Sequence, residues 1–497
     1  MFKKTKSSHT PSRKRATILQ ALGGYVNTGI IILQGLLLMP LYIRYLGADT
    51  YGLWLASGGI LGMLGLINFG ISSMLVQRIA SAYGKNDLDQ AGAYFISGMV
   101  VYLSIFLLLG GFGWALSIFL PRILTVDGHA AQLLQQCFQL AVLAVTIAVL
   151  NECLRSCSQA LLRPVVPHAN NAIGRILGIG ISLWMLLNNF GLWSIPFGML
   201  VSESVIFTLN LLNVVSLFRK LKLTARVDRN IIKEFFRTGP VLFLATAGNR
   251  VSQEAEPLLV TIIISPEITT AYMVTRRAAD VVFQMLNVLV GSIMGTFSHL
   301  TASGDHDRVR AVAKKLLTLS FSVGGIAFAT YVATNLAFVE LWVGEAMVLD
   351  KIIVLFIAIG FFSRTFRGML SQILYELSDF TYTSVIVLIE GVARVVLSVT
   401  LLSLFGLVGI PIALSIVCIM AIVVQGLRLM QLIKIRINFF VIARLIFSAG
   451  ALFGTSYYLL QGVESWLYFS LLLAGVLGGL TTLFVLLNLR MSQDMLS

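Results

Sequence analysis

The chain has 497 residues, of which 57% are hydrophobic and only 12% are charged. Soluble domains carry about 25% charged residues, so the composition excludes a water-soluble globule. The formal net charge of +14 lies mainly between hydrophobic runs, which indicates membrane topology and not nucleic-acid binding.

Hydrophobic runs of about 20 residues recur along the chain, and each is long enough to cross a bilayer as a helix. They predict about fourteen transmembrane helices, at residues 20–43, 52–75, 94–118, 131–153, 167–187, 193–217, 239–263, 269–297, 316–338, 351–374, 383–404, 409–427, 441–461 and 466–488. The sequence therefore predicts an all-α polytopic membrane protein.

The distribution of positive charge predicts the orientation of these helices. Most of the 36 Lys and Arg fall in segments assigned to the cytoplasm, including the N-terminal residues 1–19 and a basic linker at 218–238. Those on the opposite side are Arg44, Arg122 and Lys351. Both termini are therefore expected in the cytoplasm, with residues 489–497 as a cytoplasmic tail.

Short patterns that return at a nearly constant interval indicate an internal repeat. Phe-Gly-Leu-Trp-Ser-Ile-Pro at residues 190–196 returns as Phe-Gly-Leu-Val-Gly-Ile-Pro at 405–411. Six spans separate the copies, so the repeats are parallel. We expect six-helix bundles at 20–217 and 239–428 that form a V-shaped two-bundle transporter. Residues 429–488 add a basic loop and two further helices.

Motifs for catalysis, metal binding or cofactor binding are absent from the sequence. It has no Gly-x-x-x-x-Gly-Lys-Ser/Thr loop for a nucleotide, and no His, Cys, Asp or Glu constellation indicates a metal or a nucleophile. The four cysteines, Cys137, Cys153, Cys157 and Cys418, are interpreted as small buried hydrophobes. We therefore expect neither an enzyme nor a bound cofactor.

Seven arginines lie inside the predicted spans, where a charged side chain near the bilayer centre costs roughly 3 kcal/mol. Such residues usually face a cavity or a partner. The acids of the same spans are Glu203, Glu254, Glu256, Asp280 and Glu390. The spans thus hold an excess of positive charge, and the planar guanidinium fork of arginine suits phosphate groups.

Spacing within each helix separates these arginines further. Arg250 and Glu254, and likewise Glu390 and Arg394, are four residues apart and form candidate ion pairs. The leading candidates for binding a pyrophosphate or similar anion are Arg364, Arg367, Arg175 and Arg250. Secondary candidates are Arg276, Arg277, Arg394, Asn249 and Gln253. The candidates for coupling transport to an ion are Glu254, Glu256, Asp280 and Glu390.

Several segments resemble Wzx-type O-antigen and polysaccharide flippases. They are Asn27 with residues 40–54, residues 68–70 before Arg78, and residues 265–272. The wider superfamily of that resemblance includes MurJ-like lipid II flippases and MATE drug exporters.

The resemblance implies a bacterial inner-membrane protein that moves an undecaprenyl-pyrophosphate-linked oligosaccharide to the outer leaflet by ion-coupled alternating access. It would serve lipopolysaccharide or another polysaccharide, with membrane lipids and the polymerase and chain-length machinery as partners. One alternative is a MATE-like exporter of small molecules, although a positive interior disfavours cationic drugs. Others are a membrane-embedded glycan polymerase or ligase, which the short outer loops disfavour, and a non-transporting scaffold.

Overall fold

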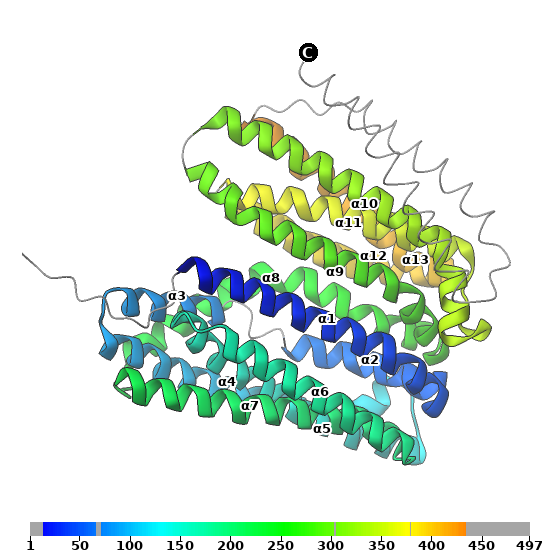
Figure 1. Cartoon of the computed structure of the whole chain (residues 1–497). Coiled ribbons are helices and arrows are strands. Elements are labelled where there is room, and N and C mark those ends of the chain that lie inside the picture. Colours follow the sequence, from blue (N-terminus) through cyan, green and yellow to red (C-terminus); the bar gives the residue numbers. More distant parts are fainter. Residues whose placement is uncertain (1–12, 66–70, 303–304, 378, 434–497) are drawn as a thin grey trace, which may run out of the picture. The chain divides into compact units, whose positions relative to one another are not determined.

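The computed structural model describes residues 13–65, 71–302, 305–377 and 379–433, and the regular elements of these residues are helices (Figure 1). Eight stretches of the described residues are long and apolar enough to cross a membrane. The predicted all-α fold is confirmed, and the chain is a multi-pass membrane protein.

The helices up to the middle of the chain are α1 (Arg13–Leu46), α2 (Ala48–Gly65), α3 (Ile71–Gly84), α4 (Leu88–Ile123), α5 (Gly128–Ala160), α6 (Val165–Leu187) and α7 (Ser194–Leu221). Those that follow are α8 (Arg229–Ile263), α9 (Pro266–Ala302), α10 (His306–Val343), α11 (Lys351–Glu376), α12 (Phe380–Phe405) and α13 (Gly409–Ile433). Short 3-10 turns lie at Gly191–Trp193, Glu345–Met347 and Gly406–Val408.

Apart from residues 66–70, the predicted spans up to residue 427 coincide with described helix. The predicted span at 52–75 corresponds to two helices, α2 and α3, and residues 66–70 between them lie outside the described residues. The last two predicted spans, at 441–461 and 466–488, also lie outside them. The four cysteines are buried, as expected for small hydrophobes.

Several helices are longer than a bilayer requires. α4 has 36 residues and α10 has 38. At about 1.5 Å per residue they exceed a hydrocarbon core about 30 Å thick. Polar residues occupy one end of each helix, since Asp87 caps α4 and Asp305 caps α10 through its side chain. These ends therefore extend into the aqueous boundary of the membrane.

The chain divides into two compact units, residues Met1–Leu258 and Leu259–Ser497. α8 begins in the first unit and ends in the second. The start of α8 and the segment before it are tied to α3 and α4 of the first unit. Thr224 donates a hydrogen bond to Asp89, the Asp228 N–H donates to Ser97 Oγ, and Glu234 forms an ion pair with Arg78. The bundle boundaries derived from the sequence stay a prediction.

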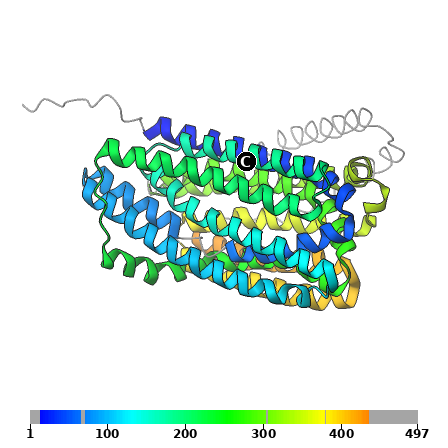
Figure 2. The same cartoon turned by 90° about the horizontal axis from the view of Figure 1, so that it is seen from below.

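Small residues determine how closely α6 and α7 pack in the first unit, where α4 to α7 lie side by side (Figures 1 and 2). Gly174 and Gly178 of α6 face Gly198 and Ser202 of α7. A Cβ atom at Gly178 would lie 2.6 Å from the Gly198 carbonyl oxygen and 2.7 Å from Ser202 Cβ. Small residues at four-residue spacing allow such backbone contact between membrane helices.

The second unit has two apolar clusters. One gathers around Phe361, Tyr331 and Ile410, and the other around Ile373 and Phe297. On α11 the first cluster ends at Phe361 and the second begins at Met369. The residues between them include Arg364 and Arg367, which form a polar layer there, while Phe362 and Phe366 of the same segment pack against the clusters.

We expect Gly178→Val to destabilise the first unit by about 1–3 kcal/mol, because the added side chain overpacks the contact with α7. The midpoint of thermal unfolding in detergent measures this effect. Gly180→Val is the matched control, since a Cβ there has nothing within 4 Å. Equal losses for the two variants would show that helix propensity, and not the contact, is responsible.

Candidate functional site

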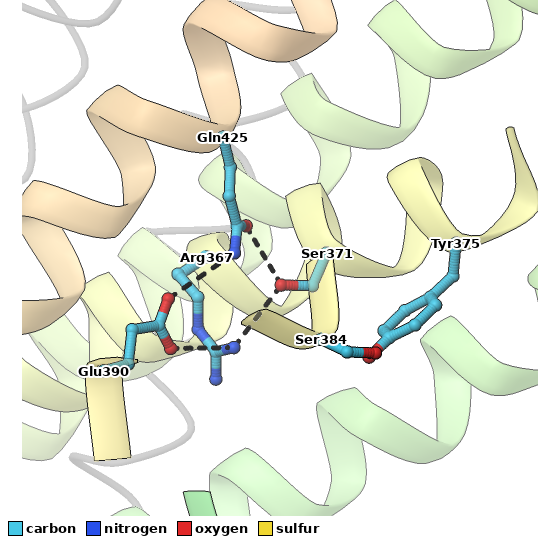
Figure 3. A network of polar contacts seen from close by, with 6 residues as sticks. All are labelled: Arg367, Ser371, Tyr375, Ser384, Glu390 and Gln425. Atoms are coloured by element: carbon cyan, nitrogen blue, oxygen red, sulfur yellow. Dashed lines mark hydrogen bonds and ion pairs between the residues drawn. The ribbon is translucent and has the colours of Figure 1, made fainter. Parts of the chain in front are cut away.

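The polar layer of the second unit contains a closed ring of side chains from three helices (Figure 3). Arg367 of α11 lies 3.2 Å from the Glu390 carboxylate of α12 and donates to Ser371 Oγ at 3.4 Å. Ser371 donates to Gln425 Oε1 of α13 at 2.9 Å, and Gln425 Nε2 donates to Glu390 at 3.5 Å. The ring holds α11, α12 and α13 together.

Burial makes this ring energetically important. Arg367 and Glu390 are 5% and 9% exposed, and Gln425 is fully buried. Removing one partner of a buried ion pair leaves an uncompensated charge, which typically destabilises a protein by about 3–5 kcal/mol. The four-residue spacing predicts Arg394 as a partner of Glu390. The structure places Arg367, from another helix, beside this carboxylate, and Arg394 also interacts with it electrostatically.

Aromatic rings cover a second arginine of the polar layer. The guanidinium carbon of Arg364 lies 3.9 Å from the ring centroid of Phe283 on α9 and 5.5 Å from that of Phe361. A cation over an aromatic face is attracted by the ring quadrupole, and more strongly when desolvated. Arg364, which is 5% exposed, is therefore stabilised without leaving the apolar surroundings.

The polar layer continues to α9 and along α12. Arg276 lies 3.1 Å from Asp280 one turn away, and its guanidinium carbon is 5.7 Å from the Phe361 centroid. Arg364 is close enough to interact electrostatically with Arg276, Asp280 and Arg394. The four arginines of the layer are each less than a tenth exposed, and the ion pairs described in it join Arg276 to Asp280 and Arg367 to Glu390.

In the first unit the most accessible candidate is Arg250 of α8, whose side chain is 51% exposed. Its Nη1 lies 3.9 Å from the Glu254 carboxylate, as the four-residue spacing predicts. Gly59 and Gly62 of α2 make room for this turn of α8. A Cβ at Gly62 would lie 2.6 Å from the Glu254 carboxyl carbon.

The other candidate arginine of the first unit is Arg175 of α6, which is partly exposed. It interacts electrostatically with Glu203 of α7, the neighbouring helix. Asn151 of α5 donates to the Glu203 carboxylate at 2.8 Å and to its backbone carbonyl at 3.1 Å. Glu203 is thus held between α5 and α6.

The remaining predicted residues are distributed over both units. Glu256 is 2% exposed and Gln253 is partly buried, both on α8. Arg277 on α9 is partly buried, while the side chain of Asn249 lies outside the described residues. Within the described part of the chain, no group of three or more His, Cys, Asp or Glu is placed to hold a metal ion.

Sequence reasoning missed several residues of these sites: Phe283, Ser371, Gln425 and Asn151. A signal existed for Gln425, because a polar amide stands alone in an otherwise apolar stretch of α13. A phenylalanine or a serine in a membrane helix carries no such signal, since both are common there.

The chain matches the sequence model of a known protein family. The sequence model of a family described as "Polysaccharide biosynthesis protein" matches residues 44–347, more than half of the chain. The chain belongs to this polysaccharide biosynthesis family. A search of curated proteins finds no match.

The fold of this polysaccharide biosynthesis protein resembles those of solved transporters. The lipid II flippase MurJ in an inward closed conformation matches with a TM-score of 0.75 at 12% identity, over 97% of this chain and 100% of that one. An inward-facing multidrug resistance MATE family transporter of the MOP superfamily matches with a TM-score of 0.67 at 15% identity, over 81% and 96%.

An outward-facing MATE transporter of the same superfamily has a lower TM-score, 0.59, at 14% identity over 86% of this chain and 98% of that one. At these identities the likeness concerns the fold. The family member thus has the fold of flippases and exporters, in agreement with the resemblance noted in the sequence.

We expect Glu390→Gln to lower the free energy of unfolding by about 3 kcal/mol, because Arg367 would keep its charge without its carboxylate. Chemical unfolding in detergent measures this loss. Adding Arg367→Gln to Glu390→Gln should restore part of the stability, as expected for coupled neighbours.

Arg308→Ala provides the control, because Arg308 pairs with Asp305 at the exposed start of α10. Its effect should stay within about 0.5 kcal/mol. If Glu390→Gln and Arg308→Ala were equally mild, the ring would not stabilise the second unit.

Proposed function

We propose that this chain is a flippase for undecaprenyl-pyrophosphate-linked oligosaccharide, the repeat unit of O-antigen or another surface polysaccharide. One observation carries the proposal: a member of the polysaccharide biosynthesis family matches the fold of a lipid II flippase over 97% of its length. The protein acts in the bacterial plasma membrane with both termini in the cytoplasm. It hands its product to the polymerase and chain-length machinery.

The excess of arginine within the membrane supports an anionic group on the substrate. Arg250 is exposed and Arg175 is partly exposed, and they bind the pyrophosphate through charge-assisted hydrogen bonds. Arg364 and Arg367 are buried in the second unit. They act there as fixed positive charges, because the low dielectric of the interior screens their field only weakly.

The substrate is moved by alternating access of the two bundles, and coupling to an ion would give the movement its direction. The coupling candidates Glu254, Asp280 and Glu390 each lie beside an arginine, at 3.9, 3.1 and 3.2 Å respectively. Glu256 is the most deeply buried of the four candidates.

A second candidate function is the export of small molecules, which the likeness to MATE transporters favours. The positive polar layer disfavours organic cations as cargo, since like charges repel. Export of a drug by purified protein, without any movement of lipid-linked sugar, would support this second candidate.

The flippase proposal is tested with the purified full chain in liposomes that contain a fluorescent undecaprenyl-pyrophosphate-linked N-acetylhexosamine. An impermeant quencher added outside measures how much of this lipid reaches the outer leaflet. We expect rapid flipping by the wild type. Flipping no faster than in protein-free liposomes would contradict the proposed function.

Arg250→Ala should weaken binding of the same lipid about tenfold or more, because a hydrogen bond to a charged group contributes about 1.5–3 kcal/mol. Arg250→Lys should recover part of the loss, since it keeps the charge without the planar fork. Arg308→Ala, at an exposed helix end of the second unit, is the control and should bind like the wild type. Unchanged binding by Arg250→Ala would remove Arg250 from the site.

A further inference from the structure

The structure gives Glu203 a neutral amide as its partner, whereas Asp280 is paired with an arginine and Glu390 with both an arginine and an amide. Asp280 and Glu390 contact arginines, which can only donate hydrogen bonds and therefore stabilise only the ionised carboxylate. The hydrogen bond recorded for the Glu203 side chain comes from a neutral amide, that of Asn151. An amide has an acceptor oxygen as well as donor hydrogens.

The acceptor oxygen of this amide is available. Asn151 is 6% exposed, and its Oδ1 is buried without a hydrogen-bond partner among the described residues. If Glu203 takes up a proton, rotation of the Asn151 amide brings Oδ1 to the new O–H group and gives up the bonds that Nδ2 donates to the Glu203 carboxylate and backbone carbonyl. Asn151 is thus equipped to hold Glu203 in both protonation states, which an arginine cannot do.

The charged groups that face Glu203 are few, and one of them is a candidate for the substrate. They are Arg175 of α6 and Glu152 of α5. Glu152 is engaged by Arg155 of its own helix. Arg175 follows Gly174, whose Cβ position lies 2.8 Å from the Ser202 carbonyl oxygen, and Glu203 follows Ser202. The close packing of α6 and α7 therefore keeps Arg175 and Glu203 together.

We propose that Glu203 is a proton-binding residue that controls the charge of Arg175, so that a proton and the pyrophosphate group of the substrate bind together. The inference rests on the proposed function. A proton from water forms an O–H bond on the Glu203 carboxylate, and Asn151 Oδ1 accepts from that group. The positive charge of Arg175 is then no longer compensated by Glu203 and attracts the anionic group.

Linkage makes this coupling reciprocal: the bound anion raises the proton affinity of Glu203 by the same factor. The proton leaves Glu203 for water when the anion leaves. A proton would thus accompany the substrate outward and lower the net negative charge of the loaded protein. The membrane potential, negative inside, favours outward movement of the remaining negative charge by about 2.3 kcal/mol per charge and 100 mV.

The test uses detergent-solubilised full chain and farnesyl-pyrophosphate-linked N-acetylglucosamine, a diester that keeps its charge near neutral pH. We expect the wild type to bind this probe more tightly as the pH falls, with proton uptake on binding. E203Q should bind about tenfold more tightly than the wild type at neutral pH, independently of pH and without proton uptake. E203D, which keeps an ionisable group, should restore the pH dependence.

Two further variants keep the inference falsifiable if E203Q does not fold. Asn151→Ala removes both the donor to the carboxylate and the acceptor for the protonated group. The bond to the charged carboxylate is the stronger of the two, so the pH dependence should move to higher pH. R175Q should bind the probe weakly and without pH dependence, because it lacks the arginine charge that Glu203 controls. E340Q, at an exposed glutamate of α10, is the control and should behave like the wild type.

The outcomes separate this inference from the proposed function. If the wild type binds the probe and E203Q or Asn151→Ala follows the pH dependence and proton uptake of the wild type, Glu203 has no such role. If R175Q keeps the wild-type pH dependence, the charge that Glu203 controls is not that of Arg175. If the wild type binds no probe at any pH, the proposed function itself is overturned, and the inference with it.

Discussion

An arginine side chain cannot lose its charge inside a bilayer, and the second unit is organised around this constraint. Arg367 reaches Glu390, and the same carboxylate accepts from Gln425, so that one ion pair connects three helices. Arg364 lies on Phe283. The apolar clusters on either side of this layer exclude water, which makes every unsatisfied charge more costly. The packing of α11, α12 and α13 therefore depends on these contacts.

The two units solve the same problem of intramembrane charge differently. In the second unit Arg276, Arg364 and Arg367 are deeply buried and contact carboxylates or aromatic rings. In the first unit Arg250 is exposed and Arg175 is partly exposed, and amides are among the buried polar groups, those of Asn151, Asn170 and Asn210. Neutral amides tolerate a change of charge nearby better than fixed ion pairs do. Charges that hold helices together thus lie in the second unit, and the charges proposed to change during transport lie in the first.

Most of the fold was predictable because membrane helices follow from local composition: about 20 apolar residues are needed wherever a helix crosses. The partners of the charged residues were not. Spacing of four residues reveals a pair such as Arg250 and Glu254 within one helix. The pairing of Arg367 with Glu390 joins different helices, and no local pattern encodes it. Glu203 stood out only as an acid in a membrane span, and its amide partner required the packing of α5 against α7.

The glycine contact between α6 and α7 has a mechanical consequence. With backbones this close, neither helix can slide or roll without collision, so α6 and α7 move as one rigid body. The distance between Arg175 on α6 and Glu203 on α7 is then fixed by this packing and does not vary as helices elsewhere in the protein move. Protonation of Glu203 would then change the compensation of the Arg175 charge by the same amount in every conformation of the transport cycle.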